Sequence, residues 1–297
     1  MNSTFQFVFD NIDKNDFIKN HFNKKPLLIK GFAEKFEGVF SLEDFNSILN
    51  SNELLYPKVR ITDHNNTIHK YDLIDDQDRY ANNINNLLNK EKMLYAIARG
   101  GTLVVDKIQE HSLKLERLME SLACEMRTRI SINGYYTARN QMGVNPHFDR
   151  HDVLAIQVHG SKRWYYREED HVLCKAIRHQ KVPAVNDDFT GWDSVLIEQG
   201  DVFYCPRGLW HFTRTEVQHS AHLAVGLYPL TLKDWLVRLE KDEHFASLLE
   251  AYVRQPFQPE VSTIDEQPVR HLVDALLSAA SQPFDLDLQP RPYLELE

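Results

Sequence analysis

Two histidines and two aspartates crowd the stretch NPHFDRHD, residues 145–152. Alternate residues of a strand point to the same face, so His147 and Asp149 can converge on one metal ion. A third ligand has to come from elsewhere, and QGDVFYCPRGLWHF offers His211 at the start of a later predicted strand. Two histidines and one carboxylate leave coordination positions open, as in the facial triad of non-haem Fe(II) oxygenases, whereas a closed zinc site takes four protein ligands.

The other polar residues of this stretch are expected to have different roles. His151 lies about 13 Å along a strand from the first histidine, too far to share its ion. We expect it at the pocket rim with Arg150, on a surface that contacts substrate. Asp152 has the opposite strand parity to Asp149, which predicts a hydrogen-bond partner within the sheet.

Further candidate residues flank the triad. Lys162 follows the turn at Gly160, and a buried ammonium there could pair with the distal carboxylate of a dicarboxylate cosubstrate; a solvated lysine is the alternative. His222 could face the pocket, although a satisfied core histidine is the favoured interpretation. Arg139 and Asn140 precede the metal stretch and could contact substrate, or lie in a solvated loop.

The residues around these candidates predict an antiparallel β domain. From Thr128 to about Tyr228, short strands are separated by turns at regular spacing, which is typical of a sandwich or barrel. The predicted strands are RISINGYYT, VLAIQVHG, RWYYR, SVLIEQGD, VFYCPRG, HFTRT and AHLAVGLYP.

Helices are predicted on both sides of this region. DKNDFIKNHFN has helical spacing and stops at Pro26, PLLIKGF predicts a buried strand, and Ser41 is a plausible N-cap of the next helix. GTLVVDKI predicts a strand that is followed by another helix. After Pro229 the chain becomes helical again, and the apolar face over Leu232–Val253 predicts a homodimer contact or packing on the core.

Composition limits the class of protein. The 297 residues, with 42% hydrophobic and 26% charged residues, describe an ordinary globular chain, and no apolar run is long enough to span a bilayer. The N-terminus lacks the pattern of a secretory signal, and three widely spaced cysteines fit a reducing cytoplasm. A net charge of -9 disfavours direct nucleic-acid binding.

The motifs together resemble a known family. HFDRHDVLAIQVHGSKRWYYR, GDVFYCPRGLWHF and HSAHLAVGLY look like the JmjC-type 2-oxoglutarate oxygenases, most of all the ribosomal oxygenases, which hydroxylate protein side chains. NGYYTARNQMGVNPH, which begins at Asn133, and the entry segment NKKPLLIKGF match as well. The resemblance covers roughly residues 5–255 and implies a mainly β fold, a double-stranded β-helix (jelly-roll or cupin) core with flanking helices.

The resemblance also implies roles for individual residues. Fe(II) would be bound by His147, Asp149 and His211, and 2-oxoglutarate would contact Lys162, Asn133 and Tyr135. With O2 as cosubstrate, such an enzyme hydroxylates a side chain and decarboxylates 2-oxoglutarate to succinate.

Two departures from the family leave the substrate open. The family usually ends in a winged-helix domain, but only about forty residues follow Gln255. We therefore expect a catalytic domain over 1–230 and a helical region over 231–297 with a truncated or absent winged helix. Gly226 also stands where a polar, substrate-facing residue is expected. Two substrate classes remain candidates: a protein, with a ribosomal protein among them, and a precursor peptide or free amino acid in natural-product tailoring. An N-methyl demethylase and a non-catalytic metal-binding cupin are less favoured.

Overall fold

The computed structural model describes residues 3–51, 54–64, 67–75, 86–138, 142–168, 182–186, 188–217, 219–229, 270 and 273–274. Residues 1–228 form one compact unit and Pro229–Glu297 a second. Within the second unit only Pro229 and three helical residues are described, namely Arg270, Val273 and Asp274. The apolar face over 232–253, and with it the expected dimer contact, lies outside the described residues, as do Arg139 and Asn140.

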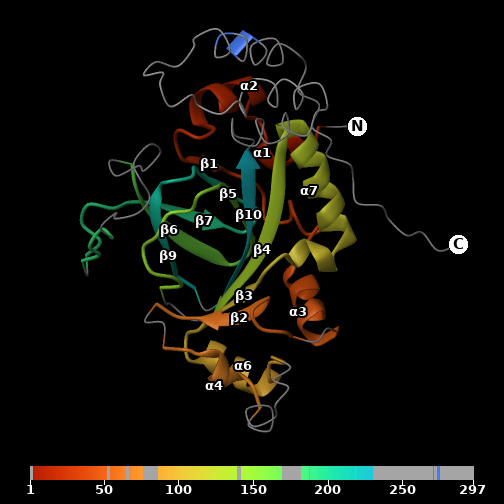
Figure 1. The fold of residues 1–297 in the computed structure, drawn as a ribbon, viewed down its shortest axis with the longest axis vertical. Coiled ribbons are helices and arrows are strands. Elements are labelled where there is room, and N and C mark those ends of the chain that lie inside the picture. Colours follow the sequence, from red (N-terminus) through yellow and green to blue (C-terminus); the bar gives the residue numbers. More distant parts are fainter. Residues whose placement is uncertain are drawn as a thin grey trace, which may run out of the picture. The chain divides into compact units, whose positions relative to one another are not determined.

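Two β-sheets form the core of the first unit (Figure 1). The larger sheet has the strand order β1-β8-β5-β10-β4-β3-β2 and the smaller one β7-β6-β9. The larger sheet contains β1 (Leu27–Ile29), β2 (Val59–Thr62), β3 (Thr102–Val105), β4 (Thr128–Ala138), β5 (Asp152–His159), β8 (Val202–Cys205) and β10 (His219–Pro229). The smaller one contains β6 (Ser161–Arg167), β7 (Asp193–Glu198) and β9 (Trp210–Thr215). The seven strands predicted between residues 128 and 228 are confirmed, and the fold is the expected double-stranded β-helix.

Helices α7 and α3 lie beside β4 of the larger sheet, α1 packs on α7, and α4 and α6 lie beyond β2 (Figure 1). The described helices are α1 (Thr4–Phe9), α2 (Lys14–Asp16), the π-helical turn η1 (Phe17–His21), α3 (Leu42–Ser51), α4 (Lys70–Leu73), α6 (Lys90–Ala98), the 3-10 turn η2 (Ile108–His111) and α7 (Leu113–Met126). The N-cap predicted for α3 is present, because Ser41 Oγ accepts from the backbone N–H of Asp44 and the Asp44 carboxylate accepts from the N–H of Ser41.

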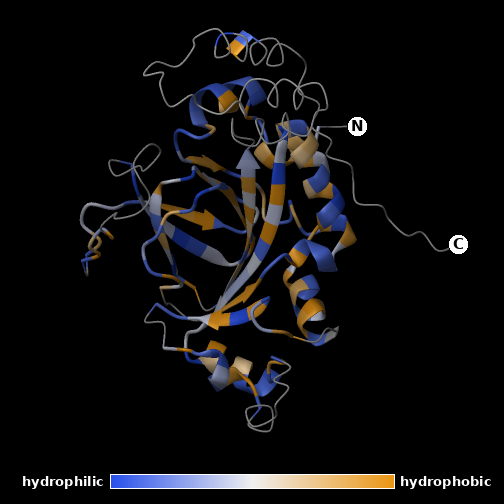
Figure 2. Ribbon diagram, in the orientation of Figure 1, coloured by the Kyte–Doolittle hydropathy of each residue, from blue (hydrophilic) through white to orange (hydrophobic). Residues whose placement is uncertain are grey.

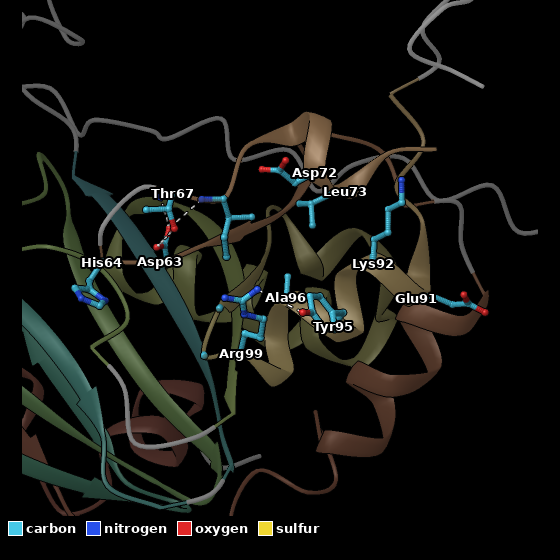
Figure 3. A pocket seen from close by; sticks show the side chains of 13 residues that line it. Asp63, His64, Thr67, Asp72, Leu73, Glu91, Lys92, Tyr95, Ala96 and Arg99 are labelled. Carbon is cyan, nitrogen blue, oxygen red and sulfur yellow. Dashed lines mark hydrogen bonds between the residues drawn. The ribbon is translucent and has the colours of Figure 1, made fainter. Parts of the chain in front are cut away.

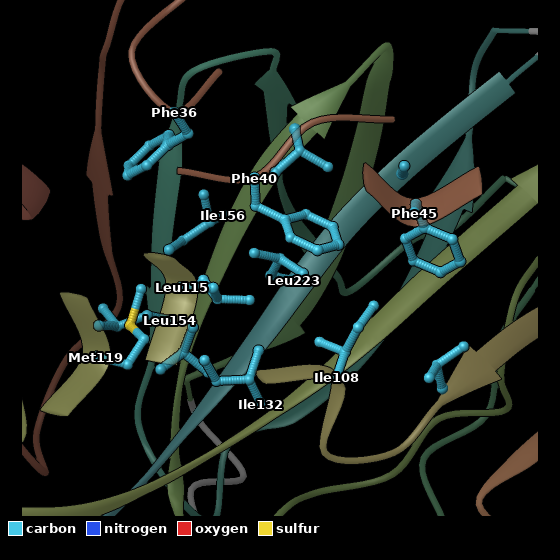
Figure 4. Close-up of a cluster of buried hydrophobic side chains, with 14 of the residues drawn as sticks. Phe36, Phe40, Phe45, Ile108, Leu115, Met119, Ile132, Leu154, Ile156 and Leu223 are labelled. Carbon is cyan, nitrogen blue, oxygen red and sulfur yellow. The ribbon is translucent and has the colours of Figure 1, made fainter. Parts of the chain in front are cut away.

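Because side chains alternate along a strand, strands of the larger sheet such as β5 and β8 contribute residues to two different hydrophobic clusters. In Figure 2, hydrophilic and hydrophobic residues alternate along β4. Leu154 and Ile156 of β5 and Leu223 of β10 face the helices, where they pack with Leu115 and Phe45 (Figure 4). The intervening residues of β5 face the smaller sheet, in a cluster with Trp164 of β6. The continuous apolar run VLAI is therefore explained by burial of β5 on both faces.

One predicted strand assignment is wrong. His147 and Asp149 precede β5, which begins only at Asp152. Pro146 carries no N–H for a ladder, and the backbone carbonyl of Asp149 accepts from Gly208 at 2.8 Å, in a turn where the φ of Gly208 is +80°. The side chains of this segment still alternate between two sides. His147 and Asp149 line the pocket, whereas Phe148 between them does not line it and packs on Trp210.

Candidate active site

The three predicted metal ligands meet in one place. The ligand atoms of His147, Asp149 and His211 all lie within 4.8 Å of one another, and His211 Nε2 lies 3.6 Å from Asp149 Oδ2. Among the residues that the structure describes, this is the one group of three such side chains at that spacing. Two nitrogens and one carboxylate from one side match the donor set of a facial triad.

The backbone fixes the two histidines against each other. His147 N–H donates to the carbonyl of His211 at 3.0 Å, and His211 N–H donates to the carbonyl of His147 at 2.8 Å. His147 Nδ1 lies 2.8 Å from the carbonyl of Asn145, and His211 Nδ1 lies 2.9 Å from the carbonyl of Leu209. Because a carbonyl only accepts, each Nδ1 is the protonated nitrogen, and each Nε2 keeps its lone pair for a metal.

Burial keeps the third ligand neutral. His211 is 4% exposed, and its pKa falls to about 4, first because of burial and second because of the neighbouring His147. The close approach of Asp149 opposes this shift but is the smaller effect. At neutral pH the pair is therefore not a salt bridge, and the His211 imidazole is ready to bind a cation without losing a proton.

Lys162 occupies the other end of the same pocket. It is 1% exposed, and burial lowers its pKa to about 7. Its ammonium nitrogen lies 3.2 Å from Thr137 Oγ1 and 3.5 Å from His222 Nδ1, and no carboxylate within ion-pair distance is found among the described residues. A buried ammonium without a counter-charge is costly, so this end of the pocket favours an anion.

Aromatic rings line the pocket between the predicted metal ligands and Lys162. Trp164 stacks on His211 at 5.4 Å between ring centroids and contacts His222 edge-on at 6.0 Å. The ring of Tyr135 stacks on His222 at 4.9 Å, and burial raises the pKa of its phenol. Asn133 lines the pocket as well, and its side-chain Oδ1 accepts from the backbone N–H of Lys107.

The whole pocket has a volume of about 140 Å³. His151 and His222 line it, whereas the exposed Arg150 is not among its lining residues. Asp152 is fully buried and its carboxylate accepts from the backbone N–H of Arg207, as expected for a partner in the sheet. Sequence reasoning missed several lining residues, among them Thr102, Ser131, Thr213, Ala224 and Tyr228. Period-2 alternation from Asn133 on β4 and from His222 on β10 would have found three of them.

A larger hollow of about 650 Å³ lies elsewhere, beside β2, α4 and α6 (Figure 3). Asp63, Thr67, Asp72, Tyr95 and Arg99 are among its lining residues, and Thr67 is tied to Asp63 by hydrogen bonds. It carries acids and bases but, among the described residues, no group with metal-ligand spacing. The smaller pocket is therefore the candidate active site, on its chemistry and not its size.

A triad of this kind between the two sheets of a β-helix defines a cupin-type protein with an open metal site. More closely, residues 104–235 match the model of the JmjC domain family. No helix within the described residues has both the length and the apolar character needed to cross a membrane.

The chain is also similar to named relatives and to solved structures. Ribosomal oxygenase 2 of Rattus norvegicus is 25% identical over 239 residues, which are 76% of this chain and 47% of the relative. Ribosomal oxygenase 1 of Danio rerio is 25% identical over 76% of this chain and 41% of its own length. The chain thus spans about half the length of these relatives. YcfD, a ribosomal oxygenase from Escherichia coli solved with cobalt and 2-oxoglutarate, has a TM-score of 0.53 at 17% identity, over 92% of this chain and 68% of that one.

Proposed function

We propose that the protein is an Fe(II)- and 2-oxoglutarate-dependent hydroxylase of an amino-acid side chain in a protein or peptide. The observation that carries the proposal is the pairing, in one pocket, of an open His147–Asp149–His211 triad with a buried ammonium that has no described counter-ion, Lys162. A metal site with free positions and an anion site a short distance away suit a bidentate 2-oxo acid with a second carboxylate.

Each residue has a stated part in this proposal. His147 Nε2, His211 Nε2 and an Asp149 carboxylate oxygen would hold the iron. Bound iron would supply the activation of O2, with oxidation of 2-oxoglutarate to succinate and CO2. The fixed tautomers keep the two imidazoles in place, and the ring of Trp164 packs on His211 beside them.

Lys162 would hold the distal carboxylate of 2-oxoglutarate. The ammonium that burial destabilises gains a counter-charge when the dianion enters, so binding would restore its proton and its favourable electrostatics. Thr137 positions the ammonium, while Asn133 and Tyr135 would line the space between cosubstrate and substrate.

The substrate side of the proposal is supported by the relatives. Several are named ribosomal oxygenases, and one Drosophila melanogaster relative, 34% identical over 34% of this chain and 16% of its own length, is named a bifunctional lysine-specific demethylase and histidyl-hydroxylase. A ribosomal protein or a precursor peptide is accordingly the proposed partner, bound without direct nucleic-acid contact, by an enzyme that we expect to be a homodimer in the cytoplasm.

Uncoupled turnover tests the proposal without a known substrate. The purified protein with Fe(II), ascorbate and 2-oxoglutarate should form succinate slowly, and His147→Ala should form none. His219→Ala is the matched control, because His219 hydrogen-bonds Tyr136 outside the pocket. Absence of both succinate and bound iron in the wild type would refute the enzyme. Peptides that gain 16 Da in the same mixture would then identify the substrate, whereas release of formaldehyde from methylated peptides would indicate demethylation instead.

A further inference from the structure

A buried lysine amine, a hydroxyl and an imidazole meet at one end of the pocket. Lys162 is 1% exposed, and its Nζ lies 3.2 Å from Thr137 Oγ1 and 3.5 Å from His222 Nδ1. The ring of His222 is held by Tyr135, which stacks on it at 4.9 Å, and by an edge contact with Trp164. An amine beside an imidazole of fixed orientation is the arrangement of a nucleophile next to a proton carrier.

No described carboxylate lies within ion-pair distance of the Lys162 amine. Besides Lys162, the described titratable side chains that line the pocket are Tyr135, His147, Asp149, His151, His211, His222 and Tyr228. Asp149 is the one carboxylate in this group, and it lies with the proposed metal ligands. Ile197 of β7 and Thr215 of β9, which pair with Lys162 on either side of β6, do not titrate. The proton on the amine is therefore stabilised by no described counter-charge.

The neutral form of this amine is abundant near neutral pH. Burial lowers the pKa of Lys162 to about 7, so about half of the amine is neutral at pH 7. A lysine of ordinary pKa has roughly one neutral amine in 2,500 at that pH. Burial and the neighbouring Lys162 also lower the pKa of His222, whose imidazole is then neutral and able to relay a proton. Only the neutral amine has a lone pair that can attack a carbonyl carbon.

The pocket gives a small molecule access to the amine. Lys162 and His222 lie at its closed end, and the face of β10 runs from His222 to Tyr228, which is 37% exposed and marks the open end. The volume of about 140 Å³ is below the roughly 300 Å³ at which pockets for drug-sized ligands begin. A compound of a few heavy atoms fits this space, and an uncharged one enters without the desolvation cost of an ion.

We propose that Lys162 is a covalent modification site, which forms an imine with a small, uncharged aldehyde when 2-oxoglutarate is absent. The Nζ lone pair forms a bond to the aldehyde carbon while the C=O π pair moves to the oxygen. Both N–H hydrogens of the amine then leave with that oxygen as water, one of them by way of His222 Nδ1, and a C=N bond remains. The reaction oxidises and reduces nothing. Because the neutral imine carries no charge, it suits the buried position better than an ammonium does.

This modification goes beyond the proposed function and does not depend on it. Under that function, the distal carboxylate of 2-oxoglutarate pairs with Lys162 and keeps the amine protonated. Bound cosubstrate would then both fill the pocket and remove the lone pair. The aldehyde and 2-oxoglutarate would therefore exclude each other at this residue, and a modified Lys162 would no longer offer an ammonium to the cosubstrate.

Reductive trapping tests the modification site directly. The full-length, unliganded protein is treated at pH 7 with propanal and sodium cyanoborohydride, whose hydride reduces the C=N bond to a stable propylamine. Peptide mapping by mass spectrometry then gives the rate at which each lysine gains a propyl group. We expect Lys162 to react at least about tenfold faster than Lys58, whose side chain is 67% exposed, because its neutral fraction is far larger. Labelling of Lys162 no faster than that of Lys58 would overturn the proposal.

Lys35 separates the effect of the cavity from that of burial. It is also buried and also has a lowered pKa, but it donates to the carbonyl of Val8 and does not line the pocket. Lys35 should therefore react more slowly than Lys162 by at least about tenfold, since an aldehyde has no comparable space beside it. Equal labelling of the two residues would show that the pocket has no part in the reaction, and would overturn the site.

Protection by the cosubstrate distinguishes this proposal from the proposed function. With Mn(II) in place of iron, 2-oxoglutarate should slow the labelling of Lys162 at least about tenfold and leave that of Lys58 unchanged. Fast labelling that 2-oxoglutarate does not slow would support the modification site and contradict the proposed function. Binding of 2-oxoglutarate without preferential labelling of Lys162 in its absence would overturn the modification site and leave the proposed function standing.

Discussion

Replacing Lys162 with methionine should stabilise the unliganded protein and abolish its binding of 2-oxoglutarate. The fall of the Lys162 pKa from 10.5 to about 7 corresponds, at about 1.4 kcal/mol per unit, to about 5 kcal/mol of unfavourable free energy for holding an ammonium in that position. Methionine fills a similar volume without a charge. We therefore expect Lys162→Met to raise the free energy of unfolding at pH 7 by about 2 to 5 kcal/mol.

The pH dependence of stability gives the sign of the effect. Because the pKa of Lys162 is lower in the folded protein than in the unfolded chain, the unfolded chain binds more protons between pH 7 and about 10.5. The stability of the unliganded wild type should therefore rise with pH across this window, relative to Lys162→Met. The same titration predicts that the affinity for 2-oxoglutarate falls by up to about tenfold per pH unit above pH 7, because the binding ammonium is lost.

Thermal and chemical unfolding, with and without 2-oxoglutarate and Mn(II) in place of iron, would measure both effects. The matched control is Lys35→Met, because Lys35 is also buried and also has a lowered pKa, but it donates to the carbonyl of Val8 and does not line the pocket. That variant should keep the stabilisation that 2-oxoglutarate confers. A Lys162→Met protein that is less stable than the wild type, or that is still stabilised by 2-oxoglutarate, would refute the assignment of an unpaired buried ammonium.

Three further perturbations test other parts of the structure. His147→Ala should lose iron, measured by metal analysis, with little change in melting temperature, since the bridge to His211 uses only the backbone of residue 147; a variant with full iron content would contradict the triad. Gly160→Ala should destabilise the protein by at least about 2 kcal/mol in urea unfolding, because its φ is +65° and a Cβ would lie 2.1 Å from the carbonyl oxygen of His219; Gly38→Ala, which meets nothing, should be neutral. Ser41→Ala should cost about 1 kcal/mol through loss of the α3 N-cap, and an unchanged unfolding midpoint would show that this cap contributes nothing.

Features that depend on local pattern could be predicted from the sequence. The strands of the β-helix follow from alternation and from turns such as Gly160, and the N-cap at Ser41 follows from its side-chain chemistry. Lys162 could be placed on the strand after that turn, but not its environment. The described partners of its ammonium are Thr137 on β4 and His222 on β10. Which residues of these strands come to lie opposite β6 is set by the register of strands that are distant in the sequence.

The irregular segment that carries His147 and Asp149 could not be predicted from the alternation of residue types. Strand parity correctly predicted that His147 and Asp149 share a side, although they do not lie on a strand. Instead of a strand ladder, two backbone hydrogen bonds join His147 to His211, and a third joins Asp149 to Gly208. His211 and Gly208 lie about sixty residues further along the chain. The proximity of His151 to Gly226 could not be predicted from the sequence either. A glycine in a strand indicates that space is available beside it, but not which side chain occupies that space.

The polar and aromatic residues of the pocket differ in burial between its two ends. Lys162, His222 and Trp164 lie at the closed end between the sheets, where a change of residue alters burial and charge and so affects folding as well as binding. His151 and Tyr228 lie at the open end, and a change at Gly226 acts on them alone. Under the proposed function, a substitution at Lys162 would alter both folding and cosubstrate binding, whereas a substitution at Gly226 would act first on His151 and Tyr228.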